Sequence, residues 1–166
     1  MRIVTAAGWS AAFFVVAPGV VAGLGPWLIT RWHTPYPWDH VGVLLFRAAG
    51  LGLLLAAVPA LVAAFARFVR EGRGTPAPVA PTTHLVVGGP YRRIRNPMYA
   101  QVVAVIAGQG LLLVRPEPLL YGIAVWLVCA AFVRWYEEPA LHRAFGADYD
   151  AYRAVVPAWL PRRRPR

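Results

Sequence analysis

The sequence predicts an all-α fold: an integral membrane helical bundle of about four transmembrane helices, followed by an interfacial helix near the C-terminus. Of the 166 residues, 58% are hydrophobic and 14% are charged, whereas about a quarter of an ordinary soluble domain is charged. The apolar residues gather in long uncharged runs with arginines between them. One soluble core of this size could not bury so many apolar side chains, so the runs indicate lipid. The length predicts one domain, 1–166.

The first uncharged run covers residues 3–30, and we place a span at 6–30. It is long enough to cross about 30 Å of hydrocarbon. Pro18 and Pro26 are expected to kink it or to shorten its helical part. A cleaved signal peptide is the competing interpretation, but such a peptide has an apolar region of only ~7–15 residues. We therefore expect a retained span.

The second run predicts a span at 41–66, with Arg47 near its start and a kink at Pro59. Small residues recur at every fourth position, namely Ala48, Gly52, Ala56, Ala60 and Ala64. Such a series favours close helix packing in lipid, unless alanine is simply common in this chain.

Two further runs predict spans at 98–114 and 118–135. The residues between them, Arg-Pro-Glu-Pro, form a tight turn, which makes the two spans an antiparallel hairpin. Arg134 is expected to reach the interface with its long side chain and so lengthen the second of these spans.

Arginine placement predicts the orientation. The linker 67–97 carries six arginines and one glutamate, whereas the loops on the other side are net neutral. The positive-inside rule therefore puts the linker, the tail 136–166 and both termini in the cytoplasm. In the tail, apolar and aromatic side chains at helical spacing predict an amphipathic interfacial helix with a possible break at Gly146.

The net charge of +10 comes from arginine alone, because the chain has no lysine. Strong basicity is also a feature of nucleic-acid-binding proteins, but here the arginines flank apolar runs, so we expect a lipid bilayer as partner and no nucleic acid. The single cysteine, Cys129, excludes an intrachain disulfide, and His33 and His40 are poorly spaced for a metal, so no metal site is predicted.

Polar residues collect at the predicted cytoplasmic face. Residues 89–99 read GPYRRIRNPMY and lead into the third span, and the fourth span ends in Glu137 and Glu138. Because the two spans form a hairpin, these segments must meet. The predicted cluster contains Tyr91, Arg95, Asn96, Tyr99, Glu137 and Glu138. The arginines alone could equally bind lipid phosphates, but adjacent carboxylates at such a face need a cationic partner.

These segments resemble the two motifs of the isoprenylcysteine carboxyl methyltransferase family, which includes related phospholipid methyltransferases. The first motif is Gly-Pro-Tyr, a basic stretch and Arg-His/Asn-Pro-x-Tyr. The second is Glu-Glu, an apolar residue, Phe-Gly and two tyrosines before a proline, here Glu137, Glu138, Leu141, Phe145, Gly146, Tyr149, Tyr152 and Pro157. The resemblance covers roughly residues 47–161 and is to bacterial members, which implies the bacterial inner membrane.

The resemblance implies an S-adenosylmethionine-dependent methyltransferase acting on a small or lipid-like acceptor, such as a carboxylate, an amine or a thiol. The implied cofactor-binding residues are Tyr91, Arg95, Asn96, Pro97, Tyr99, Glu137, Glu138, Tyr149, Tyr152, Gly50 and Gly52. The implied catalytic residues are Arg95, Asn96 and Arg153. Gly50 and Gly52 fit a Gly-x-Gly element of the phospholipid members, although helix packing is the other interpretation. Asn96 replaces a histidine of the eukaryotic pattern and cannot shuttle protons.

Two other functions stay open at this point. A membrane reductase with a sterol-reductase-like core would bind a nicotinamide cofactor instead. A scaffold or small transporter is the second alternative, but a transporter places polar residues near the midplane, where this sequence offers only Gln101 and Gln109. The sequence does not identify the acceptor or the oligomeric state.

Overall fold

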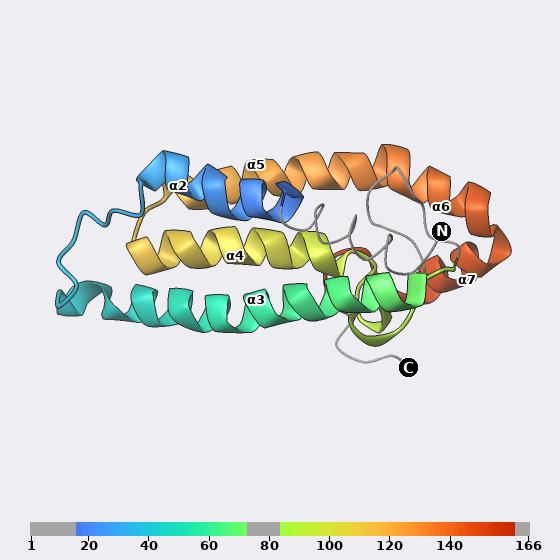
Figure 1. The fold of residues 1–166 in the computed structure, drawn as a ribbon, viewed down its shortest axis with the longest axis horizontal. Helices are drawn as coiled ribbons and strands as arrows, with labels where there is room; N and C mark the ends of the chain where they lie inside the picture. The colour runs from blue at the N-terminus through green and yellow to red at the C-terminus, as the bar shows by residue number, and fades with distance from the viewer. Residues whose placement is uncertain (1–15, 73–83, 162–166) are drawn as a thin grey trace.

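The computed structural model describes residues 16–72 and 84–161, and within these ranges the fold is all-helical, as predicted (Figure 1). In chain order the elements are η1 (Val20–Leu24), α2 (Gly25–Thr30), η2 (Val41–Val43), α3 (Leu44–Gly72), η3 (Gly89–Arg92), α4 (Pro97–Leu113), α5 (Glu117–Phe132), η4 (Val133–Glu137), α6 (Glu138–Phe145) and α7 (Ala147–Val155). The start of the first predicted span (6–15), the Pro- and Gly-rich part of the linker (73–83) and the arginine-rich end (162–166) lie outside the described residues.

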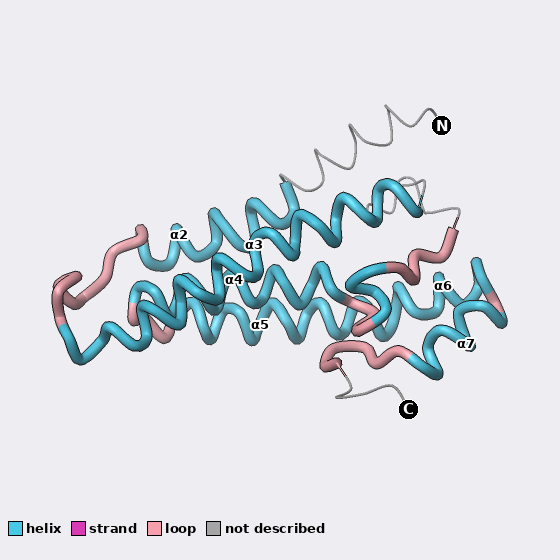
Figure 2. Tube along the Cα trace, turned by 90° about the horizontal axis from the view of Figure 1, so that it is seen from below, coloured by secondary structure: helices cyan, strands magenta, loops and turns pink. Residues whose placement is uncertain are grey.

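Helix α4 is the centre of the bundle. It runs antiparallel to α3 and α5, packs against both, and α2 with η1 lies along the same group (Figures 1 and 2). Every residue of α4 is buried or half-buried. Pro97 begins the helix, where its missing N–H costs nothing. Val114, with φ +54°, ends it and donates to the carbonyl oxygens of Gly110 and Leu111.

The α4–α5 connection matches the predicted hairpin, because only Val114–Pro116 separate the two helices. The helix at the fourth predicted span (118–135) is longer than expected. One continuous helix covers Glu117–Phe145, since the π-helical turn η4 joins α5 to α6 without a break. The first part of the predicted interfacial tail is therefore a continuation of that helix. Gly146, with φ +51°, separates α6 from α7, so the predicted break is confirmed.

The predicted small-residue seam on α3 is wrong in its first half. Ala48, Gly52 and Ala56 are exposed, whereas the buried face includes Ala57 and Leu61. The reason is geometric: a helix has 3.6 residues per turn, so positions four apart drift by about 40° per step and leave any one face. The buried side of α3 follows three- and four-residue spacing instead.

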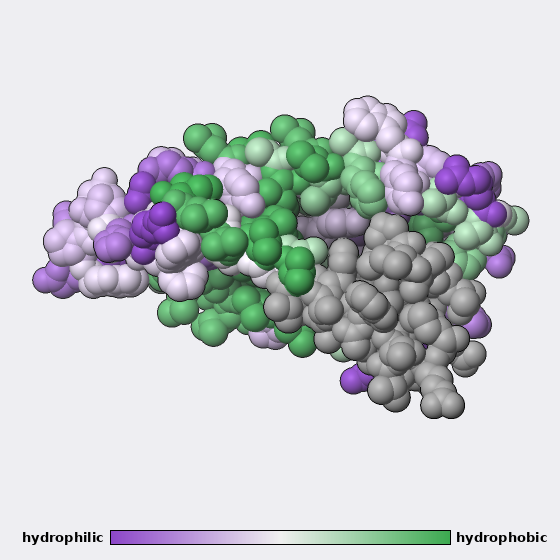
Figure 3. Space-filling model, turned by 45° about the horizontal axis from the view of Figure 1, so that its top comes forward, coloured by the Kyte–Doolittle hydropathy of each residue, from purple (hydrophilic) through white to green (hydrophobic). Residues whose placement is uncertain are grey.

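Apolar side chains cover the middle of the molecule and polar ones its two ends (Figure 3). Leu45, Leu55 and Val128 are 83%, 68% and 69% exposed. Two helices, Val41–Arg67 and Glu117–Phe145, are long and apolar enough to cross a membrane, by length and composition. Val16–Thr30 and Pro97–Leu113 are apolar but shorter. The number of four spans therefore stays a prediction.

Arg47 stabilises the end of the bundle opposite the predicted site. Its side chain, only 5% exposed, donates to the carbonyl oxygens of Pro37 at 2.7 Å and Tyr36 at 3.0 Å. Its guanidinium also stacks over Trp38, 4.6 Å from the ring centroid. Arg47 thus holds the loop between α2 and α3 against the bundle.

Candidate functional site

The predicted cluster forms at the end of the bundle where α4 begins and η4 passes into α6. A partly open cavity lies there. Besides apolar side chains, it is lined by seven of the predicted site residues: Tyr91, Arg95, Asn96, Glu137, Glu138, Tyr149 and Tyr152. The antiparallel α4–α5 hairpin brings the two motifs together, as the sequence predicted.

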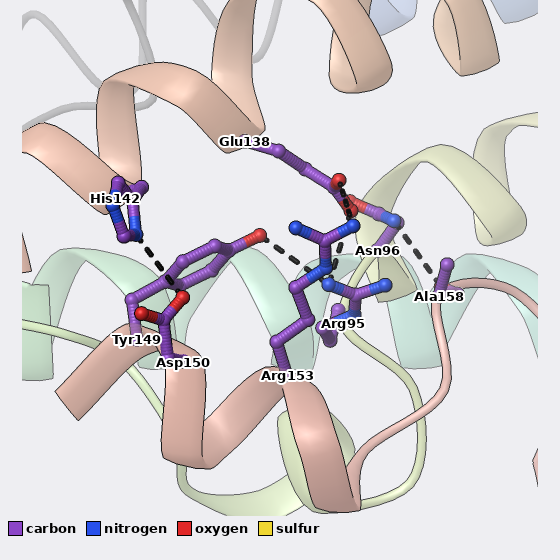
Figure 4. Close-up of polar contacts among 8 residues, drawn as sticks. All are labelled: Arg95, Asn96, Glu138, His142, Tyr149, Asp150, Arg153 and Ala158. Atoms are coloured by element: carbon purple, nitrogen blue, oxygen red, sulfur yellow. Dashed lines mark hydrogen bonds and ion pairs between the residues drawn. The ribbon is translucent and has the colours of Figure 1, made fainter. Parts of the chain in front are cut away.

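Glu138 is the centre of a buried ionic network (Figure 4). Its Oε1 lies 3.0 Å from Nη1 of Arg95, and its Oε2 lies 3.4 Å from Nη2 of Arg153. The Glu138 and Arg95 side chains are 9% and 12% exposed, whereas Arg153 is 47% exposed at the rim. One carboxylate thus joins the start of α4 to α6 and α7.

Arg95, which lines the cavity, retains unused hydrogen-bonding capacity. Its Nη1 also donates to the hydroxyl of Tyr149 at 3.4 Å. Its Nε is buried and has no hydrogen-bond partner within the described part of the chain. A buried guanidinium N–H without a partner is costly, and a ligand with an acceptor oxygen would satisfy it.

Glu137 has different surroundings from Glu138. Its Oε2 accepts a hydrogen bond from the hydroxyl of Tyr99 at 3.1 Å. Among the described residues no cation lies within ion-pair distance of this carboxylate. Glu137 is therefore a half-buried carboxyl group that is hydrogen-bonded to a phenol, an arrangement suited to a cationic or hydroxyl-bearing ligand.

The glycine that begins the first motif has two structural reasons to be glycine. Gly89 has φ +54°, and a Cβ there would come within 2.6 Å of Nε of Arg67. The turn η3 that follows buries Tyr91, 5% exposed. The hydroxyl of Tyr152 donates to the carbonyl oxygen of Tyr91 at 2.7 Å, which ties α7 to η3.

The two tyrosines of α7 are neutral parts of the site. Tyr149 is 2% exposed, and burial, helped by the charge of Glu138, raises the pKa of its hydroxyl. Burial likewise raises the pKa of Tyr152. A hydrogen bond between Nδ1 of His142 and Oδ1 of Asp150, 3.0 Å apart, further joins α6 to α7 at the outside of the site (Figure 4).

Asn96 uses part of its hydrogen-bonding capacity within the protein itself. Its Nδ2 donates to the carbonyl oxygen of Ala158 at 3.2 Å, and its backbone N–H donates to the same oxygen at 3.2 Å. Pro97 begins α4 and is fully buried, but it does not line the cavity. The sequence assigned no role to Ala158 or Trp159, because a short Pro-Ala-Trp segment carries no chemical signal of its own.

Tyr99 lies between the polar cavity and an apolar one. The apolar cavity, of about 580 Å³, is lined by Ala17, Pro18, Val21, Leu61, Phe65, Met98, Tyr99, Val102 and Cys129. Through its bond to Glu137, Tyr99 connects this space to the charged residues.

Gly50 and Gly52 do not line the charged cavity. A Cβ at Gly50 would lie 2.7 Å from the carbonyl oxygen of Gly108 and would clash with Leu112. Gly108 is about 18 Å along α4 from Asn96, at 1.5 Å per residue. Gly52 faces open space. Gly50 therefore allows α3 to approach α4 closely, in agreement with the packing interpretation.

A search of the curated proteins finds no match. The phospholipid methyltransferase family model matches residues 75–148. The matched segment includes the first motif, the α4–α5 hairpin, Glu137 and Glu138, and thus most of the charged cavity. Residues 75–148 are therefore similar to the phospholipid methyltransferases, a membrane-associated family of methyltransferases.

Proposed function

We propose that the chain transfers a methyl group from S-adenosylmethionine to a small or lipid-like acceptor at the cavity where α4 begins. The observation that carries the proposal is the unequal pairing of its two adjacent carboxylates. Glu138 is neutralised by Arg95 and Arg153, whereas Glu137 faces the same cavity without a cation among the described residues. Among the described residues, the site thus offers a guanidinium N–H without a hydrogen-bond partner together with a carboxylate without a cation.

These groups fit S-adenosylmethionine, which has a carboxylate, an ammonium group, ribose hydroxyls and a positively charged sulfur. Charged, phenolic and apolar side chains line the cavity together, as is usual for sites that bind small molecules. Arg95, through Nε, would bind the cofactor's carboxylate, where a guanidinium fits well. Glu137 would bind the ammonium group or the ribose hydroxyls, and the rings of Tyr91 and Tyr149 would flank the ligand. When bound, the cofactor supplies the methyl group on its sulfonium.

The chain's own contribution is positioning. Methyl transfer needs no protein nucleophile, so the site must align the two reactants and exclude water. Val86, Val133 and Leu141 provide the apolar wall that does so. Asn96 cannot act as a general base at neutral pH, and its amide already donates to Ala158.

The apolar cavity beside Tyr99 supports a lipid-like acceptor. Tyr99, which lines it, donates a hydrogen bond to Glu137 of the charged site, so a molecule with an apolar body could place its polar end near that carboxylate. Arg153, half-exposed at the rim, would orient an acceptor that carries negative charge. We infer that the chain is integral to the bacterial inner membrane with both termini in the cytoplasm, which the exposed apolar band and the arginine distribution support.

Gln109, one of the two polar residues that the sequence places near the midplane, does not favour transport. Gln109 donates to the carbonyl oxygen of Ala22 at 2.6 Å and accepts from Nε1 of Trp32 at 3.2 Å. Its amide therefore joins helices and leaves no free polar group for a passing solute.

Calorimetry with S-adenosylmethionine and detergent-purified full-length protein tests the proposal. Glu137→Gln removes the charge but can still accept the bond from Tyr99, so we expect binding about tenfold weaker, or about 1.4 kcal/mol, with little change in Tm. Glu138→Gln should weaken binding and also lower Tm, because it leaves Arg95 buried without its counter-charge.

Glu117→Gln is the matched control, since that carboxylate pairs with Arg115 at the opposite end of the bundle. Its affinity should equal that of the wild type. Folded wild-type protein that binds no S-adenosylmethionine at millimolar concentration would refute the proposed function.

A further inference from the structure

The last described segment turns back from α7 toward the start of α4. We call residues 156–160 the C-terminal strap. It follows the helix end at Val155, its first residue Val156 is buried, and Figure 2 shows it as a loop beside α4 and α5. The strap lies outside the family match, which ends at residue 148, so its role has to come from its contacts.

The backbone of the strap fixes the two residues that precede α4. The N–H of Arg95 donates to the carbonyl oxygen of Pro157 at 2.9 Å, and that of Asn96 donates to Ala158 at 3.2 Å. Nδ2 of Asn96 adds a third bond to Ala158. Both N–H groups come before the helix and need partners from elsewhere in the fold. The strap therefore sets the backbone from which the Arg95 guanidinium reaches Glu138.

Trp159 connects the strap to Glu137 through Tyr99. Its ring lies 6.0 Å from that of Trp126 on α5, edge-on at 72°, and 6.5 Å from that of Tyr99, tilted at 49°. Both separations are within the favourable range for aromatic pairs. Trp159 thus packs between α4 and α5 and supports the ring of Tyr99.

Tyr99 needs that support because an apolar cavity also borders it. Its hydroxyl supplies the one side-chain hydrogen bond that Glu137 receives among the described residues. Without the Trp159 ring, Tyr99 would gain space to rotate, and Glu137 would lose its fixed orientation. The contacts therefore run from Trp159 through Tyr99 to the carboxylate without a cation.

We propose that the C-terminal strap completes the S-adenosylmethionine site and that Trp159 is a positioning residue, which orients Glu137 through Tyr99. This inference rests on the proposed function and extends it to a segment after the family match. Trp159 does not line the charged cavity, so its effect on the ligand must be indirect.

The test measures S-adenosylmethionine affinity by calorimetry on detergent-purified full-length variants, with Tm measured in parallel. We expect Trp159→Ala to bind about five- to tenfold more weakly and Trp159→Phe, which keeps an aromatic ring, to recover most of the affinity. Trp135→Ala makes the same substitution outside the strap, at a side chain 78% exposed. This control should bind like the wild type.

A double-mutant cycle with Tyr99→Phe separates positioning from general stability. That variant retains the ring but loses the hydroxyl bond to Glu137, so adding Trp159→Ala to it should cost no further affinity. Additive losses, or affinity within about twofold of wild type in Trp159→Ala, would overturn the inference while leaving the proposed function intact. Equal losses of affinity and of Tm in Trp159→Ala and Trp159→Phe would overturn it as well. Absence of binding in the wild type would overturn both proposals.

Discussion

Glu137 and Glu138 are neighbours in the chain, yet their carboxylates contact different elements. Glu137 ends the π-helical turn η4, and its carboxylate accepts a hydrogen bond from the hydroxyl of Tyr99 on α4. Glu138 begins α6 and pairs with Arg95 and with Arg153 of α7. Successive helical residues point about 100° apart, so an adjacent pair at this corner of the bundle can join two separate groups of residues. The sequence predicts both as site residues but not this division.

The hydroxyl of Tyr152 gives a pH-dependent contribution to stability. It donates to the carbonyl oxygen of Tyr91, and burial raises the pKa of Tyr152 above its ordinary value of about 10. A raised pKa means that this stabilisation is complete below about pH 10 and is lost as the pH rises through the folded-state pKa. We expect Tm to fall as the pH rises above about 10, and to fall less steeply in Tyr152→Phe, which starts lower.

Thermal unfolding in detergent across this pH range checks the prediction. Tyr136→Phe is the control, because it removes a phenol that is 52% exposed and keeps the ring that stacks on Phe132. Parallel curves for wild type and Tyr152→Phe would contradict the role given to this hydroxyl.

At the scale of elements, the packing of α3 on α4 explains a motif that resembled part of a cofactor site. Gly50 faces the backbone of α4, and Gly52, two residues later, faces outward. A Gly-x-Gly motif looks the same in the sequence whether a helix packs against it or a ligand binds there. Only the position of α4 distinguishes the two, and it assigns Gly50 to packing.

Substitution by alanine is expected to have opposite effects on stability at the two glycines. Gly50→Ala should lower stability by about 1–3 kcal/mol, because the new methyl group meets the backbone atoms of Gly108 and Leu112, which cannot move independently. Gly52→Ala has open space and should raise stability by about 0.5–1 kcal/mol, because alanine favours a helix interior over glycine. Thermal unfolding in one detergent measures both. A stabilising Gly50→Ala would show that α3 and α4 are farther apart than the structure places them.

For the whole molecule, the exposed apolar band is the feature that calls for a membrane. It covers α3 and α5 between two polar ends (Figure 3), and soluble monomers rarely expose contiguous apolar surface beyond a few hundred Å². In lipid these side chains need no protein partner. The arginines at the site end would then contact anionic headgroups.

Leu55→Arg distinguishes a lipid environment from water. Leu55 is 68% exposed near the middle of the helix Val41–Arg67. Arginine there should cost about 2.5–3.5 kcal/mol in a bilayer, whereas an exposed helix position in water tolerates such a change within about 0.5 kcal/mol. We expect a clear loss of membrane-integrated protein on fractionation and a lower Tm in bicelles. Leu160→Arg, at an exposed residue beyond the helices, should leave both unchanged; equal behaviour of the two variants would contradict membrane burial of α3.

The sequence by itself determined the helical class, the α4–α5 hairpin and the meeting of residues 91–99 with Glu137 and Glu138. These follow from local rules: apolar runs of helical length, a proline-containing turn, and the fact that an antiparallel hairpin brings its outer ends together. The prediction of a packed seam was wrong for the first half of α3, because a four-residue repeat does not match 3.6 residues per turn.

Tertiary structure alone decided how the charges pair and which segments complete the site. The pairing of Glu138 with two arginines depends on α7 folding back after Gly146. The strap reaches Arg95 and Asn96 across some sixty residues of chain, and Trp159 meets Tyr99 only in the folded state. Contacts of this kind leave no periodic pattern in a sequence, because they depend on the direction in which one element leaves another.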